Sequence, residues 1–172
     1  PHEGPERHPM TGPDRITNRT FDELAAGQSA ELVRPIGTQD RELLAALTGS
    51  LPTTVAGNGG ATAGDSAFVG ALVASALDTV LPGPGTRVVS LAVEMAAPLP
   101  QDGPVTVRLT VRGKHPGGRV VLDATCHDSN GASLASAEAD VVAPAARIEV
   151  PRAAVPGVHL HSVGASFKAM TD

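Results

Sequence analysis

The stretch from Gly64 to Gly85, GDSAFVGALVASALDTVLPGPG, constrains the fold more than any other part of the chain. From about Ala67 to Val80 it predicts a helix that is apolar on nearly every side, and Asp65 or Ser66 is placed to cap its start. The run PGPG then ends this helix. A helix without a polar face must be enclosed by other elements, and its small side chains let another surface approach closely.

The elements around this helix predict an antiparallel sheet. A strand is expected over residues 28–36, followed by a helix over 39–49 that Thr38 caps and Gly49 ends. Four segments rich in Val and Thr come after the apolar helix and predict a meander of strands. The pair Asn130-Gly131 predicts a type I′ hairpin turn between the last two strands. The expected fold is α+β, with a curved antiparallel sheet wrapped around a central buried helix.

Composition narrows the class of protein. A chain of 172 residues and 17.3 kDa suits one domain, and its net charge of −5 without a basic stripe argues against nucleic acid as a partner. The single Cys126 excludes a disulfide framework and favours a reducing compartment. No apolar run has the length of a membrane span, and no signal-peptide pattern is seen. We therefore expect a cytoplasmic protein that binds neither membrane nor nucleic acid.

Shifts in composition predict the domain boundaries. Residues 1–17 are polar and rich in Pro and Gly, which predicts a flexible leader, and residues 1–9 before Met10 are interpreted as an extension. A single domain is expected over 18–150. Residues 151–172 are predicted to form a proline-spaced tail.

The chain from about Asn18 to Val150 resembles the MaoC-like hot-dog family of (R)-specific enoyl-thioester hydratases and dehydratases. The resemblance rests on NRTFDELAAGQSAEL, on GALVASALDTVLPGPGT and on VEMAAPLPQDGPVTVRLTVRGKHPGGRVVLDATC. It looks closest to the hydratase-like domain of bifunctional phosphate acetyltransferases. It implies a hot-dog fold, an acyl thioester of coenzyme A or of an acyl carrier protein as substrate, and no further cofactor. It also implies a homodimer, because hot-dog sheets pair edge to edge.

The loop LTGSLPTTVAG, residues 47–57, departs from the motif that the resemblance implies, which is roughly Asp-x-Asn-Pro-x-His. Ser50 stands in place of the Asp, Pro52 is retained, and Thr54 stands in place of the His. The hydroxyl groups of Ser and Thr have pKa values far too high for a general base near pH 7. We therefore expect that the acid–base pair of a hydratase is missing and that ordinary hydration is weak or absent.

The start of the apolar helix departs from the family as well. The stretch GDSA replaces AHGM, whose backbone N–H polarises the thioester oxygen in the family, so that Asp65 stands at the His and Ser66 at the Gly. Asp65 is interpreted either as a relocated general base or as a first-turn carboxylate that stabilises the helix. Ser66 is an oxyanion donor or a cap. The candidate catalytic residues are thus Asp65, Ser66 and Ser50.

The remaining candidates line the expected ligand groove or bear on metal binding. The resemblance places Pro52, Thr54, Asn58 and Ala67 in contact with substrate, although Asn58 in GNGG is equally explained as a turn residue. His115 and His127 do not form a ligand set, so no metal site is predicted. Cys126 is interpreted as a buried small side chain.

Three functions are consistent with this sequence. The first is an enzyme that acts on an acyl thioester through a rearranged site, as a biosynthetic dehydratase, isomerase or cyclase. The second is a non-catalytic module that binds acyl thioesters, and the third is a hot-dog dimerisation partner. The fold alone does not choose among them.

Overall fold

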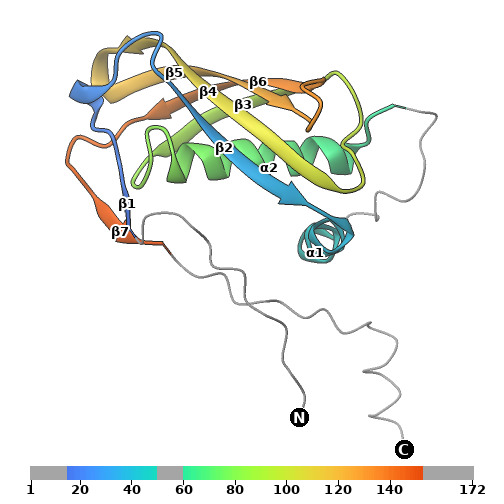
Figure 1. Cartoon of the computed structure of the whole chain (residues 1–172). Helices are drawn as coiled ribbons and strands as arrows, with labels where there is room; N and C mark the ends of the chain where they lie inside the picture. The colour runs from blue at the N-terminus through green and yellow to red at the C-terminus, as the bar shows by residue number, and fades with distance from the viewer. Residues whose placement is uncertain (1–14, 50–59, 153–172) are drawn as a thin grey trace, which may run out of the picture.

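A five-stranded antiparallel sheet curves over one long helix (Figure 1). The computed structural model describes residues 15–49 and 60–152. The helix is α2, Ala63–Thr79, and the strands lie in the order β2-β4-β5-β6-β3. They are β2 (Ser29–Ile36), β3 (Arg87–Met95), β4 (Gly103–His115), β5 (Arg119–His127) and β6 (Ser133–Val142). The predicted α+β fold, a curved sheet around a central helix, is confirmed.

Alternation along the strands builds the core between sheet and helix. The inward side chains of neighbouring strands lie opposite one another, as Val107 of β4 does to Cys126 of β5. Each Val or Leu buried in this way stabilises the fold by about 1.5–3 kcal/mol. The buried residues of α2 that face them include Val69, Leu72, Val73, Ala76 and Leu77.

One side of α2 is not covered, contrary to the prediction that the helix would be enclosed all round. Ala63, Ala67, Ala71 and Ser75 follow one another at intervals of four and are exposed. Residues four apart lie on one face of a helix, so these four form a continuous stripe. Small side chains expose little apolar area, which is why the fold tolerates a bare stripe here.

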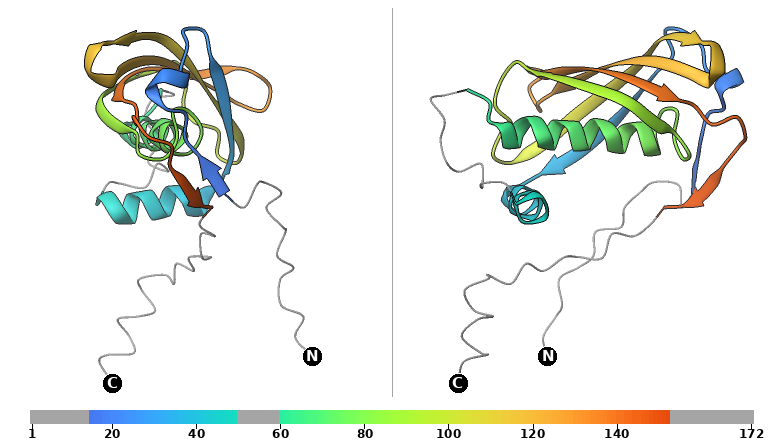
Figure 2. Two further views of the ribbon diagram at one scale, coloured as in Figure 1. Left: turned by 90° about the vertical axis from the view of Figure 1, so that its left-hand side faces the viewer. Right: turned by 180° about the vertical axis from the view of Figure 1, so that it is seen from behind.

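The strands after α2 do not form the simple meander that the sequence predicted. β4, β5 and β6 are consecutive neighbours, but β3 pairs with β6 at the far side of the sheet instead of with β4. Residues 96–102 therefore connect strands that are not neighbours. This order lets β3 run alongside α2, the element that precedes it (Figure 2, right).

Both helices begin at residues other than those predicted. Thr62 is the N-cap of α2, so Asp65 and Ser66 lie inside its first turn. Helix α1, Thr38–Thr48, follows Gly37 as its N-cap, and the Asp40 carboxylate accepts a hydrogen bond from the Gly37 N–H at 2.9 Å. The carboxylate three residues into the helix stabilises the start that Gly37 cannot cap with a side chain. Gly49 ends α1 with φ 68°, as predicted.

The turn between β5 and β6 is a hairpin of another type than predicted. A type I′ turn needs positive φ at both central residues, and among the described residues only glycines have positive φ. Gly131 adopts φ 80°, while Asp128 Oδ1 accepts hydrogen bonds from the N–H groups of Asn130 and Ala132 at 2.8 and 2.9 Å. The Asp128 side chain therefore organises the turn.

A buried asparagine connects the N-terminal and C-terminal ends of the domain through hydrogen bonds. Asn18 is 1% exposed; its Nδ2 donates to Ala146 O at 2.9 Å and its Oδ1 accepts from Ile148 N at 2.8 Å. Next to it, β1 (Arg15–Thr17) pairs antiparallel with β7 (Glu149–Pro151). β1 falls within the predicted leader and Pro151 within the predicted tail, and the structure places both in this ladder.

Candidate functional site

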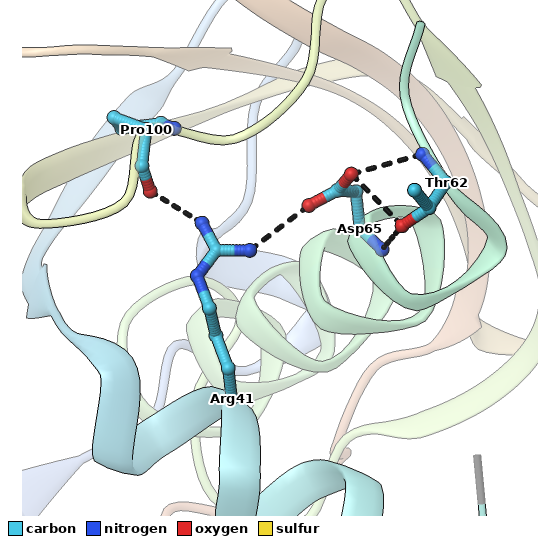
Figure 3. A network of polar contacts seen from close by, with 4 residues as sticks. All are labelled: Arg41, Thr62, Asp65 and Pro100. Atoms are coloured by element: carbon cyan, nitrogen blue, oxygen red, sulfur yellow. Dashed lines mark hydrogen bonds and ion pairs between the residues drawn. The ribbon is translucent and has the colours of Figure 1, made fainter. Parts of the chain in front are cut away.

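A polar network joins three elements at the N-terminal end of α2 (Figure 3). Arg41 reaches in from α1, Thr62 and Asp65 belong to the start of α2, and Pro100 precedes β4. The network lies where the sequence placed its sharpest candidate, Asp65. Asp65 is therefore the centre of the candidate site.

Thr62 and Asp65 satisfy each other's backbone at the start of the helix. The Asp65 N–H donates to Thr62 Oγ1 at 3.1 Å. In return, Asp65 Oδ2 accepts from both the N–H and the hydroxyl of Thr62, each at 2.9 Å. This is a capping box, in which two donors that the helix leaves unpaired are satisfied reciprocally. The positive end of the helix dipole also favours a carboxylate there.

Arg41 supplies the counter-charge. Its Nη1 lies 3.0 Å from Asp65 Oδ1, and its Nη2 donates to the carbonyl oxygen of Pro100. The side chains of Arg41 and Asp65 are only 11% and 5% exposed, so solvent screens this ion pair little. Arg41 thus ties α1 and the segment before β4 to the start of α2.

These contacts determine what the Asp65 carboxylate can do chemically. Burial by itself raises its pKa, but the hydrogen bonds from Thr62 and the hydrogen bond and charge of Arg41 outweigh burial and lower the pKa of Asp65 below its ordinary value. A general base is most effective when its pKa lies near the working pH. As placed here, Asp65 is the capping-box partner of Thr62 and the counter-ion of Arg41, and its basicity is weak.

The structure places three of the predicted site residues and leaves four outside its described part. Ser66 is half-buried, and its backbone N–H donates to Thr62 O at 3.1 Å within the first turn. Ala67 lies on the exposed stripe of α2. Asp65 and Ser66 are therefore together in one turn, and Ala67 follows them. Ser50, Pro52, Thr54 and Asn58 lie outside the described residues, and their predicted roles stay predictions.

Sequence reasoning missed three members of the network. Thr62 was detectable, because Thr62 and Asp65 have the spacing of a capping box, a Ser or Thr followed three residues later by an acid. Arg41 carried no such signal, since an arginine on an amphipathic helix is ordinarily solvated. The carbonyl of Pro100 is a backbone group, and only the folded chain shows that it is an acceptor.

Other candidate groups are scattered. Among residues 15–49 and 60–152, no group of three or more His, Cys, Asp or Glu side chains is arranged to hold a metal ion. Cys126 is buried, and burial raises the pKa of its thiol to about 11. A thiol with so high a pKa is a poor nucleophile at neutral pH.

In the described part of the chain, no helix is long and apolar enough to cross a membrane.

A shallow groove on the outer face of the sheet lies away from this network. Its lining includes Glu94, Asp123 and Glu138. Arg112 makes ion pairs with Asp123 and Glu138, and these contacts lower the pKa of Asp123. Two of the three carboxylates are thus engaged in a cross-strand cluster on the surface.

Comparisons with known proteins identify the architecture. The structure is similar to the R-hydratase PhaJ1 from Pseudomonas aeruginosa in its unliganded form, with 27% identity and a TM-score of 0.73, covering 86% of this chain and 99% of that one. The chain has the hot-dog fold. It is similar as well to the (R)-hydratase from A. caviae involved in PHA biosynthesis, with 22% identity and a TM-score of 0.60, covering 70% and 98% of the two chains.

A more distant structural neighbour is part of a complex. The ChsH1-ChsH2 complex from Mycobacterium tuberculosis matches with 15% identity and a TM-score of 0.50, over 69% of this chain and 98% of that one. No protein-family model matches the sequence, and no curated protein matches it either. The similarity to solved structures establishes the fold, and the predicted hot-dog fold is confirmed.

Proposed function

We propose that this protein binds an acyl thioester, carried by coenzyme A or by an acyl carrier protein, and that its chemistry is not the standard hydration of an enoyl thioester. The observation that carries this proposal is the similarity to an R-hydratase over 86% of the chain at 27% identity. The departures at Ser50, Thr54 and Asp65 from the hydratase motif argue against the standard reaction. If the protein is an enzyme, its reaction is a dehydration, isomerisation or cyclisation in a biosynthetic sequence.

The proposed chemistry needs no metal and no cofactor other than the thioester itself. The Asp65–Arg41 pair supports the second candidate, a module that binds thioesters without turnover, because a carboxylate held by an arginine is a weak base. We propose a homodimer as the working unit. We also propose a cytoplasmic location, in keeping with the one free cysteine.

Two assays on the full chain test this function. Isothermal titration with butyryl-CoA measures binding, and crotonyl-CoA hydration measures turnover, with the Pseudomonas aeruginosa hydratase as positive control. We expect butyryl-CoA to bind and crotonyl-CoA to be hydrated at least about a hundredfold more slowly than by the control, because each missing acid–base group is ordinarily worth about two to four orders of magnitude. Hydration at the rate of the control would disprove the altered chemistry. If the protein binds neither butyryl-CoA nor a butyryl-loaded carrier protein, the proposed thioester function is wrong.

The Asp65→Asn variant separates the enzyme from the binding module once a converted substrate is found. Loss of turnover by about a hundredfold with the fold intact would assign Asp65 to the chemistry. Unchanged turnover would make Asp65 structural and direct attention to Ser66 and Ser50.

A further inference from the structure

Helix α1 lies outside the two layers that form the core. Figures 1 and 2 show it apart from the sheet, near the N-terminal end of α2. In the described part of the chain, none of its residues belongs to the cluster of buried core side chains or to the half-buried ones packed against that cluster. Its one buried residue is Ala45, and Leu47 is 76% exposed. Burial of apolar area therefore holds α1 in place more weakly than it holds α2 or the strands.

Glycines stand at both ends of α1. Gly37 is its N-cap and follows Ile36, which is 5% exposed and belongs to the core, and Gly49 is its C-cap with φ 68°. Glycine changes its backbone conformation at lower steric cost than other residues. Residues at the ends of an element that can absorb such changes are the hinges of rigid-body motions. At Gly37, α1 can therefore turn as a unit while Ile36 keeps β2 in the sheet.

The side chain of Arg41 fastens α1 to two other elements (Figure 3). Its Nη1 lies 3.0 Å from Asp65 Oδ1 on α2, and its Nη2 donates to the carbonyl oxygen of Pro100 before β4. The planar guanidinium presents its donors in a fixed fork, so one side chain can bind both acceptors at once. Both contacts are lost together when α1 moves away, and Arg41 thus acts as a latch.

With this latch closed, the start of α2 is shielded. The Asp65 side chain is 5% exposed, although Ala63 and Ala67 in the same stretch of helix are exposed. Arg41 contacts its Oδ1 and Thr62 contacts its Oδ2. Thr62 belongs to the start of α2 itself and stays in place when α1 moves, whereas Arg41 leaves with α1. Movement of α1 would therefore open the Asp65 carboxylate to solvent from the Oδ1 side.

We propose that α1 is a lid over the start of α2, hinged at Gly37 and latched by Arg41, and that it opens as a unit while α2 and the sheet stay folded. The lid controls access to the candidate site around Asp65. Its role in the entry of a thioester rests on the proposed function. The opening itself does not, because it is measured on the protein without any ligand.

Amide hydrogen exchange on the full chain at low urea concentrations tests the opening. The α1 amides should exchange through an opening that depends weakly on urea, because it exposes little surface, whereas the β5 amides should exchange through strongly urea-dependent global unfolding. Arg41→Met should speed exchange in α1 about a hundredfold, since it removes one half of a buried ion pair. Glu42→Gln is the matched control, because Glu42 is exposed on the same helix, and it should leave the exchange of α1 unchanged.

Labelling of carboxylates with a water-soluble carbodiimide and an amine, located by mass spectrometry, tests access to Asp65. In the wild type Asp65 should react far more slowly than the exposed Glu42, and Arg41→Met should speed the reaction of Asp65 at least about tenfold. One common urea dependence for the α1 and β5 amides would overturn the proposal, because α1 would then open only with the whole domain. Equal labelling of Asp65 and Glu42 in the wild type would overturn it too. The same holds if Arg41→Met leaves the exchange of α1 unchanged, or if Glu42→Gln speeds it as much as Arg41→Met.

Discussion

Removing Arg41 should destabilise the fold far more than removing an arginine from the surface of the sheet. In Arg41→Met the Asp65 carboxylate, 5% exposed, loses its only ion-pair partner in the described chain but keeps both hydrogen bonds from Thr62. Breaking one half of a buried ion pair costs about 3–5 kcal/mol, and the surviving hydrogen bonds put our expectation near the lower end, about 3 kcal/mol. That is a large part of the roughly 5–15 kcal/mol that stabilises a typical domain.

The Asp65→Asn variant should lose less stability than Arg41→Met. In Asp65→Asn the amide oxygen can still accept from Thr62, and Arg41 keeps its hydrogen bond to Pro100 but loses the attraction of the Asp65 charge. We expect about 2 kcal/mol. A carboxylate that acted only in the capping box would tolerate this change at less than about 1 kcal/mol, because the amide oxygen of Asn can accept the same hydrogen bonds from Thr62.

Urea unfolding followed by circular dichroism measures these free energies, and a double-mutant cycle isolates the pair. If the side chains interact directly, the sum of the stability losses in the two single variants should exceed the loss in the double variant by at least about 1.5 kcal/mol. Arg108→Met is the control: Arg108 and Glu31 form an ion pair, but their side chains are 57% and 43% exposed, so the loss should stay below about 1 kcal/mol. Single losses below about 1 kcal/mol at Arg41 and Asp65 without coupling would refute the reasoning, since solvent would then screen the pair.

Four further predictions concern the pH dependence of stability, the buried Asn18, the glycines with positive φ and the thiol of Cys126. Because the pKa of Asp65 is lowered in the fold, its contribution to stability should be present above the ordinary pKa of 3.8 and lost as pH falls through the lowered value, so Asp65→Asn should flatten the acid side of the stability–pH curve. Asn18→Ala should lower the free energy of unfolding by about 2–4 kcal/mol, because the Ile148 N–H and the Ala146 carbonyl each lose the buried Asn18 side chain as a hydrogen-bond partner. A smaller loss in chemical denaturation would show that water takes the place of the Asn18 side chain. Gly83→Ala should lower the melting temperature more than Gly27→Ala does. Both glycines have positive φ, but an added Cβ at Gly83 would lie 3.0 Å from the Asn18 Cα, whereas Gly27 has open space around it. Equal melting temperatures of the two variants would contradict this. Cys126 should not react with a disulfide reagent in the native protein at pH 8 and should react on unfolding, because its thiol pKa is raised to about 11; rapid native labelling would show that the site opens.

The candidate site was predicted from sequence only in part. The position of Asp65 at the start of the helix was found, since helix starts select acids and small polar residues. Its chemical state was not, because whether a carboxylate is a base or a counter-ion depends on charges that approach through space. Arg41 lies 24 positions earlier in the chain, and no local pattern connects the two.

The sequence by itself determined the two α-helices and the five strands of the large sheet, and which helix lies at the centre, but not the short pair β1 and β7. The apolar stretch around Val73 has no polar face, and alternating strands such as β5 bury one side, so burial of apolar area demands this arrangement whatever the details of the chain path. Tertiary structure alone decided the rest. It placed β3 beside β6 instead of β4, left one stripe of α2 bare, and brought Arg41 against Asp65. These features depend on which surfaces meet after the chain has folded back on itself, and the period of apolar residues along a segment carries no information about that meeting.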